Sequence, residues 1–186
     1  MKQVLDITAT VVGVAAVVLY GLGYWQKDRR KIVLIGAISR VLYVAQYLLL
    51  GELSGAIMDV ISATGAIFAG RRHVGFLKKL PWLVPTAIVT ATLAAGIPLF
   101  LRSGNVFDLF PVAGVILQTV ALCLTKEKHI RLLSLAGSPF WMIYNIQAGS
   151  VAVVGDIWCM TALSVSIIRY DVIAPLREKR KHKRAR

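Results

Sequence analysis

The sequence has few residues of the kinds that bind metal ions or form structural disulfides. Its two cysteines, Cys123 and Cys159, lie inside apolar runs. Its three histidines, His73, His129 and His182, lie in basic connecting segments, and no Cys-x-x-Cys, His-x-x-x-His or Glu-x-x-His spacing occurs. A zinc site or a disulfide framework needs such clusters. We therefore expect no metal and no cofactor.

Charged residues are scarce as well. Asp, Glu, Lys and Arg make up 17% of the 186 residues, whereas 57% are hydrophobic, and the mean hydropathy is +0.69. A soluble domain is typically about 25% charged and about 45–50% apolar. A soluble core of this chain length could not hide so much apolar surface from water. The composition excludes an ordinary soluble globule and favours a polytopic membrane protein.

The apolar residues gather in seven runs of the length that a bilayer requires. A helix needs about 20 residues to cross about 30 Å of hydrocarbon, and a helix satisfies its own backbone amides there. The seven predicted segments are approximately 4–25, 32–50, 53–70, 80–101, 106–124, 131–148 and 151–168. The links between them are short, which suits helical hairpins. We expect an all-α fold with seven transmembrane helices.

The basic residues are distributed unevenly between the two ends of these segments. Of the 22 Lys and Arg residues, all except Lys2, Arg40 and Arg102 fall in the links and tail on one side. Because basic loops stay in the cytoplasm, this side is predicted to be cytoplasmic. An odd number of crossings then leaves the N-terminus outside and the C-terminus in the cytoplasm.

The two halves of the chain show a weak internal repeat. Aligning the basic links at 27–30 and 126–129, with a two-residue slip at the outer turn, matches three polar pairs: Ser39 with Ser138, Gln46 with Asn145, and Asp59 with Asp156. Basic links follow from topology anyway, but a matched pair of intramembrane acids does not. The pattern predicts two parallel three-helix repeats.

These repeats divide the chain into four parts. Residues 1–70 and 105–172 form the two repeats, residues 71–104 hold a loop and a linker helix, and residues 173–186 form a basic cytoplasmic tail. In transporters with parallel repeats, the substrate site lies near the midplane between the halves. The polar residues within the predicted helices are therefore the candidates for such a site.

Asp59 and Asp156 lie within predicted spans, where a carboxylate costs about 2.5–3.5 kcal/mol at the helix centre. Such an acid is expected to face a cavity or a partner. Arg40 lies on a polar stripe of its helix and has two interpretations. It binds an anionic group or keeps an acid ionised until substrate arrives, or it forms a permanent ion pair with one aspartate that fixes the packing.

The sixth segment adds Ser138, Trp141 and Asn145 on one helix face, and Trp158 follows Asp156 by two residues. An aromatic plate with amide and acid groups suits a flat polar ligand, although tryptophan also forms interfacial belts and small polar residues also hold helices together. The predicted substrate-binding set is Arg40, Gln46, Asp59, Ser138, Trp141, Asn145, Asp156 and Trp158. Pro111 and Pro139 are predicted to interrupt helices and to serve in gating.

The tail at 177–186 is a polybasic run beside the last span. Anionic lipid attracts such a segment by about 1 kcal/mol per basic residue. The run has no interleaved aromatic residues and no folded module of the kind that binds nucleic acid. We expect anionic lipids as its partner and no nucleic acid.

Three stretches of the second half carry a family resemblance. They are LFPVAG at 109–114, WMIYNIQAGS at 141–150 and IIRY at 167–170. With these motifs, nearly the whole chain resembles the YgjV-type bacterial inner-membrane family, which implies an inner-membrane location and brings no catalytic residues. The helix plan is more distantly similar to SWEET sugar transporters, PQ-loop proteins and nicotinamide riboside transporters, although the chain lacks their Pro-Gln dipeptide.

These observations favour a small-molecule transporter or facilitator. A receptor or scaffold that binds a ligand or partner without moving it is the alternative. An intramembrane enzyme is disfavoured, because no intramembrane histidine and no nucleophile–base spacing is present. Substrate identity, ion coupling and assembly with further copies stay open at this stage.

Overall fold

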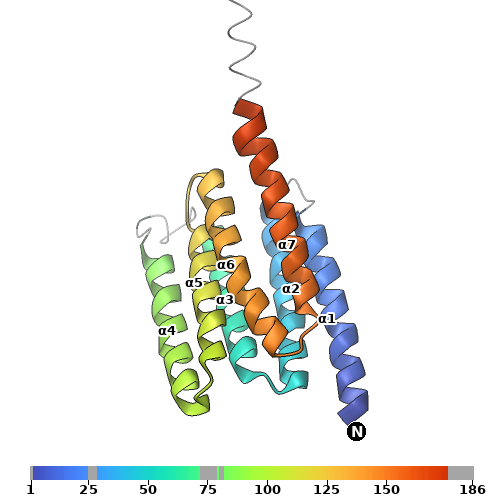
Figure 1. Cartoon of the computed structure of the whole chain (residues 1–186). Helices are drawn as coiled ribbons and strands as arrows, with labels where there is room; N and C mark the ends of the chain where they lie inside the picture. Colours follow the sequence, from blue (N-terminus) through green and yellow to red (C-terminus); the bar gives the residue numbers. More distant parts are fainter. Residues whose placement is uncertain (1, 25–28, 72–78, 80–81, 176–186) are drawn as a thin grey trace, which may run out of the picture.

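The structure is a computed structural model that describes residues 2–24, 29–71, 79 and 82–175. Within these ranges it is all-helical, which confirms the expectation of an all-α fold. The α-helices, which run side by side in Figure 1, are α1 (Lys2–Tyr24), α2 (Arg29–Leu50), α3 (Leu53–Arg71), α4 (Leu83–Ser103), α5 (Leu109–Leu122), α6 (Glu127–Gln147) and α7 (Ala152–Ser166). The predicted tail at 177–186 lies outside the described residues.

Most helix boundaries differ from the predicted segments by a few residues, and three of these differences have a local structural basis. A short 3-10 turn, Val106–Asp108, precedes α5, and the Asn105 side chain accepts a hydrogen bond from the Phe107 amide at 3.1 Å. α6 begins at Glu127 instead of residue 131, consistent with the preference for an acid in the first turn of a helix. α7 continues as a π-helix over Ile167–Ile173 instead of ending at 168.

The π-helical extension of α7 is tied to the start of α6. Arg131 donates from Nε and Nη2 to the two carboxylate oxygens of Asp171, at 3.0 and 2.7 Å. The guanidinium groups of Arg131 and Arg169 also lie over the Tyr170 ring, 5.7 and 5.4 Å from its centroid. These contacts give the extra turn partners that the sequence pattern did not reveal.

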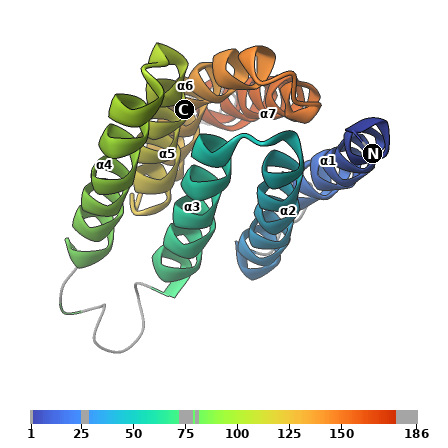
Figure 2. The same cartoon turned by 90° about the horizontal axis from the view of Figure 1, so that it is seen from below.

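The helices pack in a closed ring. α1 contacts α2, α2 contacts α3, α3 contacts α5, α5 contacts α6, α6 contacts α7, and α7 returns to α1. α4 lies outside this ring, against α3 and α5, as the view in Figure 2 also shows. Six helices thus surround a common centre and the seventh covers one seam.

The turns that follow α2 and α6 are built in the same way. Gly51 and Gly149 adopt φ values of 79° and 64°, a left-handed conformation that suits glycine. Beyond each glycine, the next amide bonds back to a carbonyl five residues earlier: Glu52 to Tyr47 at 2.9 Å and Ser150 to Asn145 at 3.0 Å. This is the helix-ending motif in which a left-handed glycine lets late amides satisfy the last carbonyls.

The outer surface of the bundle is largely apolar, and several polar side chains are buried inside it. The exposed side chains of α1 include a helical stripe of aliphatic residues: Val4, Ile7, Val11, Val14, Val18 and Leu22. In contrast, Gln46, Asp59 and Asn145 are at most 3% exposed. A soluble protein shows the reverse pattern, because water favours polar surface. The distribution is that of a bundle whose outer surface contacts lipid.

Length and composition identify three helices in the described ranges that can cross a membrane. They are Gln3–Leu22, Leu83–Ser103 and Ala152–Ile173, the last of which includes the π-helical turn. Shorter apolar helices cover Leu34–Leu50, Leu53–Ala69 and Val106–Leu122. α6 is as long as α4 but more polar.

The contact between α4 and α5 depends on a small residue. The buried positions of α4 are Val84, Ile88, Thr92 and Gly96, one residue per turn of the helix. A Cβ atom at Gly96 would lie 2.2 Å from Cγ2 of Val112, which is buried in α5. Close helix contact in membranes commonly requires such small residues.

We therefore expect Gly96→Ala to destabilise the protein. Because Val112 is β-branched and buried, overpacking at this contact should cost about 1–3 kcal/mol and lower the midpoint of thermal unfolding in detergent by about 2–4 °C per kcal/mol. Gly36→Ala is the matched control, since nothing lies within 4 Å of a Cβ there. Equal midpoints for the two variants would contradict the observed packing of α4.

Candidate functional site

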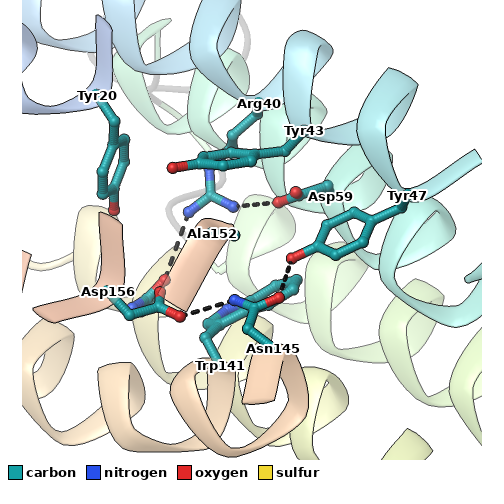
Figure 3. Close-up of a pocket in the computed structure, with 10 residues that line it drawn as sticks. Tyr20, Arg40, Tyr43, Tyr47, Asp59, Trp141, Asn145, Ala152 and Asp156 are labelled. Atoms are coloured by element: carbon teal, nitrogen blue, oxygen red, sulfur yellow. Dashed lines mark hydrogen bonds and ion pairs between the residues drawn. The ribbon is translucent and has the colours of Figure 1, made fainter. Parts of the chain in front are cut away.

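A polar pocket lies where the ring of helices closes. Its lining residues are Tyr20, Arg40, Tyr43, Tyr47, Asp59, Gln118, Trp141, Asn145, Ala152 and Asp156. They come from α1, α2, α3, α5, α6 and α7, so every helix of the ring contributes at least one. Figure 3 shows the polar groups converging on the same space.

Arg40 is the positive centre of this pocket. Its Nη1 donates to Oδ1 of Asp59 at 2.6 Å, and the two side chains are 13% and 4% exposed. Its Nη2 donates to Oε1 of Gln118 on α5 at 3.4 Å. The guanidinium also faces the Asp156 carboxylate on α7, with which it interacts electrostatically (Figure 3). One cation therefore connects acids from the two halves of the chain.

A second chain of hydrogen bonds crosses the pocket from α2 to α7. The Tyr47 hydroxyl donates to Oδ1 of Asn145 at 2.5 Å, and Nδ2 of Asn145 donates to Oδ2 of Asp156 at 2.7 Å. Asn145 uses its acceptor and its donor at once, which fixes the orientation of its amide. Because Tyr47 and Asn145 are each 1% exposed, the bond between them is shielded from solvent, whereas the bond to Asp156 is partly buried.

Aromatic rings form much of the pocket wall. Tyr20 and Tyr43 meet edge to face with centroids 6.3 Å apart, and Tyr47 stacks on Trp141 at 6.5 Å. Glycines make room for two of these rings. A Cβ at Gly114 would clash with the Trp141 indole, and one at Gly155 would clash with the Tyr43 hydroxyl.

The structure brings five of the eight predicted binding residues to the pocket. These are Arg40, Asp59, Trp141, Asn145 and Asp156. Ser138 lies one contact away, because its hydroxyl accepts a hydrogen bond from Nε2 of Gln118 at 3.2 Å. It can act on the pocket by holding the amide that contacts Arg40.

Gln46 does not line the pocket. It is fully buried, and its amide packs where a Cβ of Gly13 on α1 would lie. In the described part of the chain, neither polar atom of this amide has a hydrogen-bond partner. The sequence alignment matched Gln46 with Asn145, but the equivalent turns after α2 and α6 show that Tyr47 occupies the position in α2 that corresponds to Asn145 in α6. A shift of one residue rotates a side chain by about 100° around the helix.

Trp158 also lies away from the pocket, on the outer side of α7. It is 44% exposed and borders an apolar groove between α1 and α7, next to Gly21. Pro111 is buried in the first turn of α5, where it interrupts no helix because the amides of a first turn lack intrahelical partners. Pro139 does lie inside α6, as predicted.

The predicted binding set did not include the tyrosines or Gln118, although Tyr43 and Tyr47 belong to the polar stripe of Arg40 that was expected to face the interior. Arg40, Tyr43 and Tyr47 recur at i, i+3 and i+7, so helical spacing was the signal for two of them. Tyr20 and Gln118 lie on helices without other pocket residues, and no local pattern marks them. Among the described residues, no group of three or more His, Cys, Asp or Glu side chains could hold a metal ion.

The pocket encloses only about 30 Å³. That is room for roughly one or two water molecules, whereas pockets for drug-sized ligands measure about 300–1,000 Å³. The polar side chains are close together and bonded to one another. A metabolite would fit only after the helices of the ring move apart.

Comparison with known proteins agrees with the membrane character of the bundle. The model of the Imp-YgjV family, described as a bacterial inner membrane protein, matches residues 7–173. Searches of the curated proteins and of the solved structures find no match. The distant likeness to SWEET-type transporters therefore stays a prediction.

The bond between Tyr47 and Asn145 can be tested by a double-mutant cycle. We expect Tyr47→Phe to lower the free energy of unfolding by about 0.6–1.7 kcal/mol, between the average and the maximum measured for hydrogen bonds between membrane helices. In an Asn145→Ala background the same substitution should cost little, because the acceptor is gone. Denaturant titration of purified protein measures both values.

Tyr170→Phe is the control, since Tyr170 is 53% exposed and keeps its ring contacts with the two arginines. An undiminished effect of Tyr47→Phe in the Asn145→Ala background would show that the hydroxyl acts elsewhere.

Proposed function

The chain belongs to the Imp-YgjV family of bacterial inner membrane proteins, and we propose that it moves a small molecule across that membrane through the central pocket. The observation that carries this proposal is the pocket itself. It places an arginine, two aspartates and an asparagine at the centre of a bundle whose outer surface is apolar. Charged groups within membrane spans are costly and typically mark substrate or ion pathways.

The proposal includes two parallel repeats, α1–α3 and α5–α7, joined by α4. The ring of contacts supports this division, since α1, α2 and α3 follow one another just as α5, α6 and α7 do. The two equivalent outer turns at Gly51 and Gly149 support it as well.

A matched pair of contacts between the halves gives further support. The alignment that matches Asp59 with Asp156 also matches Ser62 with Cys159. Ser62 is 3.1 Å from the Thr119 hydroxyl on α5, and the Cys159 thiol donates to the Tyr20 hydroxyl on α1 at 3.7 Å. The sequence alignment of the basic links matches Tyr20 with Thr119 in turn. Both seams between the halves therefore use equivalent positions.

Alternating access by rocking of the two halves follows from this architecture. The pocket lies at the junction, so tilting one half against the other would open it towards one side of the membrane and then the other. Closing would restore the bonds from Tyr47 and Arg40, which connect the first half to Asn145 and Gln118 in the second. Pro139 within α6 removes one backbone bond and would ease bending there.

A membrane receptor or scaffold is the second candidate. The small volume of the pocket and its internally bonded side chains favour it, because a rigid centre can transmit binding without passing a solute. This candidate requires saturable binding without flux. Neither candidate assigns the pocket a chemical reaction.

The first prediction of the transporter proposal concerns ligand binding. A substrate should raise the thermal midpoint of the detergent-purified protein, because binding to the native state stabilises it by mass action. A panel of sugars, nucleosides, vitamins and amino acids should contain a compound whose effect is lost in Asp156→Asn. The same compound should cross the membrane of reconstituted vesicles only when wild-type protein is present.

Asp108→Asn is the matched control for this experiment. Asp108 is a buried acid outside the pocket, bonded to the Ser103 hydroxyl. It should therefore change stability without abolishing the ligand effect. Stabilisation by a ligand without flux would favour the receptor, and a complete lack of ligand effects would count against both candidates.

The second prediction concerns orientation. The excess of Lys and Arg on one side predicts a cytoplasmic C-terminus and an external N-terminus. A fluorescent protein that folds only in the cytoplasm should fluoresce when fused after residue 186. Alkaline phosphatase, which is active only outside the cytoplasm, should be active when inserted near Asn105 and inactive near Lys126. The opposite activities would reverse the proposed orientation.

A further inference from the structure

The charges around the pocket do not balance. Its lining includes two carboxylates, Asp59 and Asp156, but a single cationic side chain, Arg40. With both acids ionised, the described lining carries a net charge of −1. This count concerns the residues that form the wall, and it does not depend on any one hydrogen bond.

An excess negative charge is costly in this position. The side chain of Asp59 is 4% exposed and Asp156 is only partly exposed, so water screens neither charge well. Arg40 bonds directly to Asp59 and also faces Asp156, so its single positive charge is shared between two carboxylates. Buried charges are stable when they are paired, and a second positive group would complete the pairing.

The remaining groups near Asp156 do not supply this charge. Asn145 donates a neutral amide hydrogen to it, and the Tyr20 and Tyr43 hydroxyls approach from α1 and α2 (Figure 3). Asp59 on α3 adds a like charge to the same space. Every element packed around the carboxylate therefore presents a neutral or acidic group, except for the shared guanidinium.

The aromatic wall indicates which kind of cation fits. Tyr20, Tyr43, Tyr47 and Trp141 all line the pocket, and two pairs of these rings lie in contact. The faces of such rings attract organic cations, and recognition of quaternary ammonium groups by aromatic cages rests on this effect. A hydrated metal ion would instead require a denser set of oxygen ligands.

We propose that the central pocket binds a small organic ammonium group, which places its positive charge between Asp156 and the aromatic rings. This inference rests on the proposed function for the location of the site, and it adds the class of ligand. The pocket of about 30 Å³ has room for a primary ammonium group, and a bulkier trimethylammonium group requires the ring of helices to widen. The rest of a larger substrate would enter as the halves separate.

Two simple cations test the proposal with the full-length protein in detergent. Methylammonium and choline are the probes, and each has a neutral analogue: methanol, and the alcohol in which carbon replaces the nitrogen of choline. At saturating concentration the cations should raise the thermal midpoint of the wild type by about 2–4 °C or more, and the neutral analogues should not. Equal effects of cations and analogues would overturn the proposal.

Charge variants provide the second measurement. Asp156→Asn removes the excess negative charge, so its affinity for the cations should fall at least tenfold. Asp59→Asn should also weaken cation binding, because Arg40 can then pair with Asp156. This variant provides the test if Asp156→Asn does not fold. Asp108→Asn again serves as the control and should bind the cations like the wild type. Unchanged cation affinity in both pocket variants would overturn the proposal.

A wild type that responds to neither cation would also overturn it, since the second charge would then be balanced by a proton. The outcome is separable from that of the transport proposal. Flux of a neutral or anionic solute with no cation binding would remove this inference and leave transport standing. Cation binding without flux of any solute would support this inference and remove the transport proposal.

Discussion

The contact between Arg40 and the acids of α3 and α7 is the interaction on which the interior of this bundle depends. A guanidinium and two carboxylates cannot remain at the centre of a membrane protein unless they face one another, because each isolated charge would be too costly there. Arg40 meets Asp59 at 2.6 Å and faces Asp156 across the pocket. Their positions determine which faces of α2, α3 and α7 turn inward, and the aliphatic stripes then point outward.

The two proposed repeats differ in their chemistry. Equivalent glycine turns end α2 and α6, and equivalent positions form the contacts Ser62–Thr119 and Cys159–Tyr20. The arginine, however, belongs to the first half alone. α4 likewise covers only the seam between α3 and α5, while the corresponding seam between α7 and α1 leaves an apolar groove. The two sides of the pocket therefore differ in charge, and a ligand of the proposed kind would bind there in one orientation.

Much of the architecture could be predicted because membrane helices obey a simple rule of length and hydropathy. All seven predicted segments correspond to α-helices, and the pairs Gly51–Glu52 and Gly149–Ser150 were correctly placed between helices. The intramembrane charges were also informative, since their cost restricts them to the interior. Arg40, Asp59 and Asp156 could therefore be assigned to one site before any coordinates were known.

The sequence by itself determined which segments are helical and which charged residues must be buried, because both follow from the energy of backbone amides and charges in hydrocarbon. The tertiary structure decided which neighbours share the pocket. Tyr47 faces Asn145 while Gln46 faces Gly13, a difference of one residue around α2 that weak sequence identity could not resolve. Tyr20 and Gln118 line the pocket and Trp158 does not, because the order of the helices around the ring is set by packing between segments far apart in the chain.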